Sequence, residues 1–454
     1  TCIVELLHQL FCARPDSRIL VVSQQNTAVD NALDRFLEQF PGFSSNVLRI
    51  GNDVEKVQVE VRPRMTENVL MEYLRERQQD YSLASLENPE KADWIETWMD
   101  RIYHPSDRGR SQFDDELAEL VVQDHGLIGA TCVGLSSRRY GMDRLAFDIC
   151  IVDEGGRATV PELLIPLMRS RKAIIIGDHF QLPPSIGRAL QEAEAKTVLP
   201  FLEETFLKTS FFEQLYENLP AACSGRLVEQ FRMVEPIGDL VADLFYTAND
   251  VRGLHNGKVH ERKDFLDAEH CMRWVDVPHG KEENEGTSLF NEAESKAIVD
   301  FLKASAHKLA SRRAEGTHSF TTKSVAIITP YGAQKRVINK DFAALRKSLP
   351  LIDDVFEVKI DTVDSFQGSE ADIVLYSTVR TQGGIRFLLD RQRLNVACSR
   401  ARENLTFFGH AQFLLKQERG KNALFSLIIK RSARATASNP FQANTHKSKV
   451  PLSS

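Results

Sequence analysis

The chain has 454 residues, more than one hydrophobic core ordinarily holds, so we expect two or three domains. Hydrophobic residues make up 42% and charged residues 26%, which is typical of a globular protein in water. The formal net charge of −6 excludes a uniformly basic polyanion-binding protein but is compatible with a local basic groove. No apolar run approaches the roughly 20 residues that span a bilayer, so we expect no membrane partner. The first residues lack the basic start and the small-residue cleavage site of a secretory signal.

The seven cysteines are scattered along the chain, and no two of them form a C-x-x-C pair. Their odd number and irregular spacing fit neither a disulfide framework nor a zinc site. We interpret them as reduced thiols of an intracellular protein, in the cytoplasm or the nucleus.

Six short apolar runs have the composition of buried parallel strands. Isoleucine, valine and leucine follow one another in them without polar alternation, as expected where a sheet is covered on both faces. Polar or glycine residues and then a helical pattern follow each run, and this repetition predicts an α/β architecture. The runs are RILVVS (18–23), FDICIVD (147–153), KAIIIGD (172–178), SVAIITP (324–330), DIVLYSTV (372–379) and NLTFFG (404–409).

Helical patterns interleave with these runs at residues 27–40, 161–170 and 291–310. Residues 55 to about 125 interrupt the alternation, because they are charged, helical in pattern and without a good strand. We predict that they form a helical insertion between two strands of the first lobe. The chain thus divides into a first α/β lobe, a second α/β lobe, a terminal helix and a disordered tail, over residues 1–215, 220–415, 416–431 and 432–454.

Two carboxylates stand side by side at the end of one apolar run, as Asp153 and Glu154. Ligands of open α/β sheets bind at the carboxyl ends of strands, and Mg²⁺ takes oxygen ligands while keeping most of its waters. Asp153 would hold Mg²⁺ through a water, and Glu154 would orient and deprotonate an attacking water. The alternative is that both acids are solvated residues opening a loop, and the dipeptide alone favours that alternative.

A second acid-tipped strand follows about 25 residues later and reads AIIIGDHFQLPPS. It ends in Gly177 and Asp178, before Gln181 and two prolines. Strands of a parallel sheet that are separated by one helix place their tips near each other. The amide of Gln181 can contact a phosphate oxygen from this proline-stiffened loop, although most proline-rich loops are only turns.

Five segments of the chain read VDEGG, GDHFQLPP, EQFRM, VDSFQGSEADIVLYSTVR and RLNVACSRAREN. They occur in the order and spacing of the superfamily 1 helicases, and the chain most resembles the up-frameshift/senataxin-like group of that superfamily. The resemblance covers most of residues 1–412. It implies two RecA-like P-loop NTPase lobes with parallel sheets that bind ATP and Mg²⁺ between them. It also implies 5′-to-3′ stepping along single-stranded RNA or DNA.

The resemblance implies roles for residues of the first two segments. Asp153 matches the magnesium-binding aspartate, and Glu154 matches the catalytic glutamate. Gly155-Gly156 follow where many relatives have small or polar residues, and we expect little consequence from them. Asp178 is expected to bind the nucleotide, and Gln181 matches the residue that contacts the γ-phosphate and couples hydrolysis to movement.

The other segments supply candidates in the second lobe. Arg232 matches an arginine that reaches the γ-phosphate, and Phe231 replaces the tyrosine common beside it. Gly368 and Glu370 match a loop whose glutamate contacts the ribose. Arg400 matches the arginine finger, whose guanidinium neutralises the charge that spreads over a transferring phosphate. Either arginine alone would be interpreted as a surface ion-pair residue.

Further segments resemble the loops with which the family contacts a nucleic-acid strand. Hydroxyls and amides that contact the backbone suit a motor that moves over any sequence. Turn and helix-capping roles are equally good interpretations of the first two candidates. We expect a monomeric motor, alone or within a larger complex. The candidate contacts are Ser23, Asn26, Thr131, Tyr331, Gln334, Thr362 and Ser365.

The chain contains no G-x-x-x-x-G-K-[ST] string, the phosphate loop that such a motor needs. Its first residues resemble the helix after that loop, and Thr1 matches the last hydroxyl of the loop or the residue after it. Two explanations stay open, a longer protein cut just past the lysine or a degenerate motor that lacks the loop. We favour the first, because Glu154, Gln181 and Arg400 are retained. We therefore expect this chain alone to bind nucleotide weakly and to hydrolyse little.

A second class of function is a non-catalytic nucleic-acid-binding module that keeps the motor fold. A nuclease fused to a motor finds little support, because no further acid or cysteine cluster stands outside the motor segments. The residues leave both RNA and DNA open as the strand, and both unwinding and translocation alone as the activity.

Overall fold

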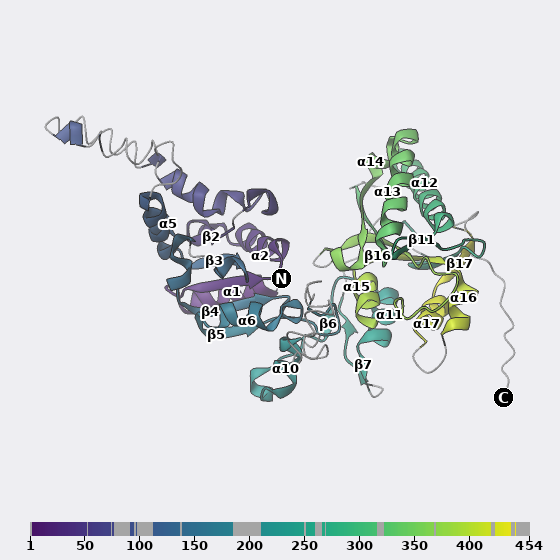
Figure 1. Ribbon diagram of the computed structural model, residues 1–454, viewed down its shortest axis with the longest axis horizontal. Coiled ribbons are helices and arrows are strands. Elements are labelled where there is room, and N and C mark those ends of the chain that lie inside the picture. The colour runs from purple at the N-terminus through teal and green to yellow at the C-terminus, as the bar shows by residue number, and fades with distance from the viewer. Residues whose placement is uncertain are drawn as a thin grey trace. The chain divides into compact units, whose positions relative to one another are not determined.

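The chain forms two compact units in the computed structural model drawn in Figure 1. The first unit comprises Thr1–His179 and Pro183–Ser224, and the second comprises Phe180–Leu182 and Gly225–Ser454. The predicted join between residues 215 and 220 precedes this division. The structure describes residues 2–51, 53–73, 75–76, 91–94, 97, 112–136, 139–184, 210–248, 251–258, 266–267, 269–315, 322–366, 369–418, 423–436 and 441.

A five-stranded sheet in the order β2-β3-β1-β4-β5 forms the centre of the first unit, and all its neighbouring strands are parallel. The strands predicted at 18–23 and 147–153 are confirmed, and the one predicted at 172–178 begins and ends earlier. Two further strands escaped prediction, because one has three residues and the other contains a glycine. The strands are β1 (Ile19–Ser23), β2 (Val47–Arg49), β3 (Leu127–Thr131), β4 (Phe147–Asp153) and β5 (Ser170–Ile175).

Helices cover both faces of this sheet. Alternate residues of β1 belong to two different hydrophobic clusters, Leu20 and Val22 to one, Ile19 and Val21 to the other. Successive strand side chains point to opposite faces, so the two clusters lie on opposite sides of the sheet. The first cluster includes residues of α5 and α6, and the second includes residues of α1 and α2. These helices, with α10, are α1 (Cys2–Ala13), α2 (Asn26–Gln39), α5 (Gln112–Asp124), α6 (Val160–Leu167) and α10 (Phe211–Asn218).

The predicted insertion over residues 55–125 is described in part. Its described residues are mainly helical and form no strand of the sheet. Residues 77–90, 95–96 and 98–111 lie outside the described part. Short 3-10 segments of this unit are η1 (Pro41–Asn46), η2 (Val54–Lys56), η3 (Arg62–Arg64), η5 (Gly134–Ser136), η6 (Arg139–Arg144) and η7 (Gly155–Arg157).

The second unit contains a six-stranded parallel sheet in the order β14-β13-β15-β16-β10-β17. The runs predicted at 324–330, 372–379 and 404–409 are confirmed as its three consecutive strands β13, β15 and β16. Strands β10 and β14 were not predicted, because polar residues interrupt their apolar runs, which read MRWVD and FEVKIDT. The strands are β10 (Met272–Asp276), β13 (Lys323–Thr329), β14 (Phe356–Thr362), β15 (Ala371–Ser377), β16 (Ala401–Gly409) and β17 (Ala433–Thr436).

The prediction of a disordered tail over 432–454 is wrong for its first residues. Ala433–Thr436 form β17, which pairs in parallel with β10. Phe441 stacks on Phe301, with ring centroids 5.2 Å apart. The single helix predicted over 416–431 is also wrong, because α16 ends at Gln417 and α17 begins at Leu424. The other residues of the predicted tail, 437–440 and 442–454, lie outside the described part.

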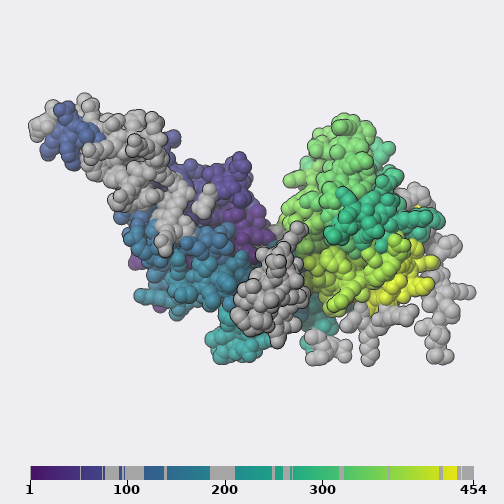
Figure 2. All heavy atoms as spheres, viewed as in Figure 1, coloured from purple at the N-terminus to yellow at the C-terminus, as the bar shows by residue number. Residues whose placement is uncertain are grey.

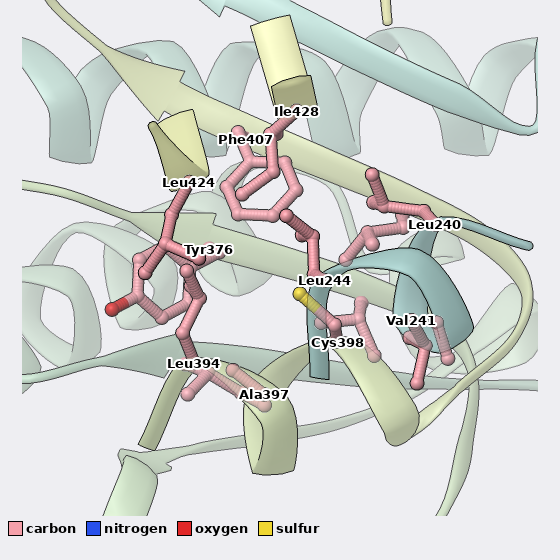
Figure 3. Close-up of a cluster of buried hydrophobic side chains, with 14 of the residues drawn as sticks. Leu240, Val241, Leu244, Tyr376, Leu394, Ala397, Cys398, Phe407, Leu424 and Ile428 are labelled. Atoms are coloured by element: carbon pink, nitrogen blue, oxygen red, sulfur yellow. The ribbon is translucent and has the colours of Figure 1, made fainter. Parts of the chain in front are cut away.

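Two hydrophobic clusters lie on the two faces of the second sheet, since Phe407 and Phe408 of β16 belong to different ones. Figure 3 shows the first cluster, in which side chains of α11 and α15 point toward Phe407 and Tyr376 of the sheet. The second cluster lies under α12 and α13, which Figure 2 shows side by side in green. The helices are α11 (Glu235–Phe245), α12 (Glu292–Ala314), α13 (Gly332–Ser348), α14 (Leu351–Val355), α15 (Arg391–Ser399), α16 (Ala411–Gln417) and α17 (Leu424–Arg431).

In the part of the chain that the structure describes, no helix is long and apolar enough to cross a bilayer.

The second unit also contains short strands and 3-10 segments outside its main sheet. The short strand pairs are β6 (Glu229–Gln230) with β9 (His255–Asn256), β7 (Thr247–Ala248) with β8 (Val251–Arg252), and β11 (Glu283–Glu285) with β12 (Ser288–Phe290). The remaining 3-10 segments are η8 (Ala221–Cys223), at the end of the first unit, and η9 (Val363–Ser365).

Candidate active site

The acid pair lies where the sequence predicts it, at the carboxyl end of a central strand. Asp153 is the last residue of β4, and the backbone N–H of Glu154 donates to Asp153 Oδ1 at 3.0 Å. Glu154 has φ 55° and ψ 36°, in the left-handed region that few residues other than glycine adopt. Such strained conformations gather at functional sites, where the surrounding structure holds them.

Asp153 combines a partly buried carboxyl group with a charged neighbour. Burial and, to a smaller extent, the adjacent Glu154 carboxylate together raise its pKa to about 6. A bound cation would reverse this shift by favouring the anion. Among the described residues, no group of three or more His, Cys, Asp or Glu side chains could hold a metal alone. The Asp153 carboxylate is an oxygen donor of the kind that Mg²⁺ takes together with waters.

Glycines allow the loops after β4 and β5 to approach each other closely. Gly155 N–H donates to the carbonyl oxygen of Ile176 at 2.8 Å. A Cβ on Gly177 would lie 2.7 Å from the backbone nitrogen of Gly156, and one on Gly156 would lie 3.0 Å from the Asp178 carbonyl oxygen. Our expectation that Gly155-Gly156 have little consequence is wrong, because a side chain on Gly156 would crowd the backbone of Asp178 and one on Gly155 would crowd the Ile175 side chain.

Replacing Gly177 by alanine is expected to lower the free energy of unfolding of the first unit by about 1–3 kcal/mol, the usual cost of overpacking. The new methyl group meets backbone atoms, which cannot rotate away. Urea denaturation followed by amide hydrogen exchange in β4 and β5 measures the change. Gly42→Ala is the matched control, since its Cβ would meet no atom within 4 Å. Equal effects of the two variants would contradict the close-approach argument.

Two residues predicted to contact nucleic acid lie on β1 and β3, to one side of Asp153 at the same edge of the sheet. Ser23 is in register with Asp153 on one side and Thr131 on the other. Ser23 is fully buried, and its hydroxyl accepts from Gln25 N–H at 3.5 Å, so the prediction of a direct nucleic-acid contact is wrong for it. The Thr131 hydroxyl accepts from Gly134 N–H at 3.1 Å, and its contact to nucleic acid stays a prediction.

The start of α1 lies at this same edge. Near the other end of α1, His8 stacks on Phe40 and Phe11 packs beside Phe43, with ring centroids 4.0 and 5.4 Å apart. Phe40 and Phe43 follow the end of α2, which itself begins just after β1. Both helices thus begin at the carboxyl edge, where free N–H groups favour a phosphate. Thr1, the predicted loop residue, lies outside the described residues.

The second unit brings four of the predicted residues together. Arg232 Nε donates to Glu370 Oε2 at 2.9 Å, and its Nη1 donates to the carbonyl oxygen of Ser399 at 3.1 Å. The next residue, Arg400, is buried and its Nη2 donates to Gln181 Oε1 at 3.3 Å. Two guanidinium groups, one carboxylate and one amide thus occupy one cluster. Gly368, the other predicted member, lies outside the described residues.

Gln181 belongs to the second unit because its neighbours pack there. Leu182 is buried in the core cluster under α11 and α15. Asn395 Nδ2 donates to the carbonyl oxygen of Phe180 at 2.9 Å and to the Tyr246 hydroxyl at 3.0 Å. Sequence reasoning gave Asn395 no role, although it lies inside the segment RLNVACSRAREN.

A glutamine that sequence reasoning missed builds the turn at Phe231 and Arg232. Gln230 Oε1 accepts from the backbone N–H groups of Arg232 and Met233, at 3.0 and 2.8 Å. Its Nε2 donates to Asn256 Oδ1 at 2.6 Å. Phe231 is 59% exposed, and its ring lies so close to Gly257 that a Cβ there would clash with it. A largely exposed ring on a fixed turn can stack on a nucleotide base.

The residues of the second unit that are predicted to contact nucleic acid lie at or after the ends of β13 and β14. The Thr362 and Ser365 hydroxyls are 3.3 Å apart, and Tyr331 is half-buried, with its pKa raised by burial. Gln334 is fully buried, its Oε1 accepts from Asn291 N–H, and its Nε2 donates to the carbonyl oxygen of Asn291 and to Ser377 Oγ. The prediction for Gln334 is therefore wrong, because no part of its amide reaches the surface.

Two family models described as AAA domain match the chain, over residues 1–187 and 207–412. An uncharacterized ATP-dependent helicase of Methanocaldococcus jannaschii is 26% identical over 90% of this chain and 63% of its own length. The DNA polymerase alpha-associated DNA helicase A of Saccharomyces cerevisiae is 26% identical over 91% of this chain and 61% of its own. The probable helicase senataxin of Mus musculus is 30% identical over 63% of this chain and 10% of its own.

The chain belongs to the superfamily 1 helicases, in the up-frameshift/senataxin-like group. This helicase chain spans less than two thirds of the length of each relative above. It is also similar to a solved arterivirus nonstructural protein 10 helicase, with 10% identity, a TM-score of 0.38, and 94% of this chain and 60% of that chain covered.

The helicase residues form two groups. Asp153 and Glu154 stand at the sheet edge of the first unit. The cluster of the second unit consists of Gln181, Arg232, Glu370 and Arg400. That the two groups act on one nucleotide stays a prediction.

Proposed function

We propose that the protein is an ATP-dependent helicase or translocase that couples hydrolysis of ATP, with Mg²⁺, to 5′-to-3′ movement along single-stranded nucleic acid. The observation that carries the proposal is the partly buried acid pair at the end of β4, in which Glu154 has a strained backbone. The family to which the chain belongs supports the same reading.

Each acid has a distinct task in this proposal. Asp153 holds Mg²⁺, which would supply charge neutralisation at the phosphates. Glu154 orients a water and accepts its proton as that water attacks the terminal phosphate. Burial raises the pKa of Asp153. A bound cation would keep this carboxylate ionised, as a metal ligand must be.

The guanidinium groups of the second unit neutralise the transferring phosphate. A planar guanidinium presents paired donors to phosphate oxygens, so it suits this task better than lysine. Arg232 is paired with Glu370, and binding of a nucleotide would redistribute that pair. Gln181, which accepts from Arg400, is placed to respond to the same change.

The nucleic-acid partner is proposed to contact the carboxyl edges of both sheets through Asn26, Thr131, Tyr331, Thr362 and Ser365. These side chains lie beside or after strand ends, where open α/β sheets bind ligands. Hydroxyl and amide groups recognise the backbone rather than the bases. We propose a monomeric motor, alone or within a larger complex.

The proposal is tested by ATP hydrolysis with and without single-stranded oligonucleotides. Two proteins are compared, the chain itself and the loop-extended chain, in which a G-x-x-x-x-G-K-[ST] loop precedes Cys2. We expect little hydrolysis from the chain, and hydrolysis stimulated by the strand at least about tenfold from the loop-extended chain. Strand binding without stimulated hydrolysis by the loop-extended chain would favour the non-catalytic nucleic-acid-binding module instead. Robust turnover by the chain itself would refute our expectation for it.

A further inference from the structure

An exposed loop connects β15 to α15 at the carboxyl edge of the second sheet. Gln382, Gly383 and Gly384 are exposed, as are Arg386 and Phe387 two residues further on. Ile385 and Leu388 are buried in the core beneath, so the loop is anchored between its exposed parts. Gly383 has φ +64°, a conformation that glycine adopts without strain.

A strained turn starts this loop. Val379 has φ +68°, and Arg380 N–H donates to the carbonyl oxygen of Thr378 at 2.8 Å, which closes a γ-turn with positive φ. A β-branched residue in this conformation is a rare outlier. Its N–H donates to Glu294 Oε2 at 2.8 Å, and its carbonyl oxygen accepts from Asn291 Nδ2 at 3.2 Å. Both sides of the strained peptide are therefore held.

The Glu294 carboxylate, which accepts the Val379 N–H, is itself buried and hydrogen-bonded. Glu294 is fully buried, and the Ser377 hydroxyl donates to its Oε2 at 2.6 Å. Burial raises the pKa of Glu294 to about 7, against the opposing effect of these hydrogen bonds. Glu282 holds the next residues, because its Oε2 accepts from Thr381 N–H at 2.8 Å. The strained backbone at Val379 is thus held by the carboxylates of Glu294 and Glu282. Strain that the surrounding structure holds in this way indicates that the path of the loop serves a function.

Phe387 is the aromatic residue that this loop presents. Phe387 is 42% exposed, which is unusual for a large apolar residue. The Arg393 guanidinium carbon lies 4.7 Å from the ring centroid, and the Tyr331 ring packs at 5.6 Å. Arg393 Nη1 donates to Asp390 Oδ2 at 2.7 Å, and its Nε donates to Asp364 Oδ1 at 3.4 Å. The ring is thus fixed by its neighbours while part of it faces the solvent.

The charged side chains around the Phe387 ring favour a ligand that stacks on the ring over one that only pairs with Arg393. Two carboxylates offset the charge of Arg393, so this guanidinium is a poor phosphate ligand. Arg386, one residue before the ring, is exposed and makes no ion pair within the described part of the chain. An aromatic surface beside one available positive charge is the pattern of sites that bind single strands.

We propose that Phe387 stacks on a base of a bound single strand and that Arg386 contacts the adjacent phosphate. The inference deepens the proposed function, on which it rests, by adding a base-stacking site to the backbone contacts of the second unit. Tyr331, Thr362 and Ser365 lie at the ends of the neighbouring strands β13 and β14, on the same edge of the sheet.

The test measures the Kd of the 454-residue chain for fluorescent oligo-dT and oligo-U of about 20 nucleotides, longer than common single-strand sites. Phe387→Ala is expected to raise Kd about 5- to 100-fold for whichever strand the protein binds. Phe387→Tyr keeps the ring and should bind as the unmodified chain does. Phe387→Leu keeps apolar volume without the ring and should bind like the alanine variant. Val251→Ala, which removes another exposed apolar side chain, is the control.

Two further arms separate stacking from charge and from loss of structure. With an abasic oligonucleotide, the effect of Phe387→Ala should vanish, because no base is left to stack. Arg386→Ala should reduce the slope of log Kd against log salt by about one, whereas Phe387→Ala should leave it unchanged. Circular dichroism and thermal unfolding establish that each variant is folded.

The outcomes distinguish this inference from the proposed function. If the unmodified chain binds neither strand at low salt, the proposed function fails. If the unmodified chain binds but Phe387→Ala and Phe387→Leu bind equally well, the stacking site is overturned and the proposed function stands. An equal effect of Phe387→Ala on normal and abasic strands would also overturn it.

Discussion

Replacing Glu154 by glutamine is expected to lower ATP hydrolysis by about 10²- to 10⁴-fold while nucleotide binding is retained. Glutamine has nearly the size of glutamate but accepts no proton, so it removes the proposed base. Asp153, the proposed Mg²⁺ ligand, is unchanged in this variant. The hydrogen bond to Asp153 Oδ1 comes from the backbone N–H of residue 154, so the substitution keeps it. Phosphate release under saturating oligonucleotide measures hydrolysis, and titration with a fluorescent ATP analogue measures binding.

The comparison uses the loop-extended chain and a matched substitution. Glu38→Gln makes the same chemical change on the exposed end of α2, away from the carboxyl edge, and should leave turnover intact. Turnover by Glu154→Gln within about twofold of the control would exclude Glu154 as the base. Loss of nucleotide binding together with turnover would indicate that the strained residue has a structural role instead.

The acid pair was predictable because its signal is local. A continuous apolar strand followed by two carboxylates places charged groups at a sheet edge wherever the other strands lie. The same holds for β13 and β15, which are apolar enough to be buried without knowledge of their partners. Strand β17 reads ARAT, and only its pairing with β10 makes it a strand. Its sequence alone carries no strand signal.

The failures at the site have a common physical cause. Gln334 lies in the segment TPYGAQK, which predicts a polar contact, yet its amide bonds Asn291 and Ser377, residues 43 positions away. Gln230 escaped notice for the opposite reason, because its hydrogen bonds build a turn whose function belongs to Phe231 and Arg232. Whether a polar side chain faces a ligand or the core depends on partners distant in the sequence. Residue type and spacing do not contain that information.

Replacing Arg49 by alanine is expected to lower the free energy of unfolding of the first unit by about 3–5 kcal/mol. Arg49 and Asp30 are fully buried, and Arg49 Nε donates to Asp30 Oδ1 at 2.6 Å. Asp30 Oδ2 accepts the backbone N–H of Gln58 at 3.0 Å, and this neutral donor does not replace the charge of Arg49, so the variant leaves a buried carboxylate without its countercharge. Amide hydrogen exchange in β1 and β3 under increasing urea reports on this unit separately.

Removing both charges at once separates the ion pair from simple packing. The double variant Asp30→Leu with Arg49→Met should be much more stable than Arg49→Ala, because no unpaired charge is left in the core. Arg35→Ala, on the exposed side of α2, serves as the control and should change stability by less than about 0.5 kcal/mol. A loss for Arg49→Ala as small as for Arg35→Ala would contradict the argument.

The same arginine connects stability with the predicted strand contact. Arg49 Nη2 donates to Asn26 Oδ1 at 2.8 Å, and its Nη1 donates to the carbonyl oxygen of Ile50. Arg49→Lys keeps the charge but cannot reach three acceptors from one planar group. Lysine should therefore recover part of the stability while leaving Asn26 without its partner. Because Asn26 begins α2 at the carboxyl edge, weaker single-strand binding by the folded lysine variant would show that the buried pair orients this contact.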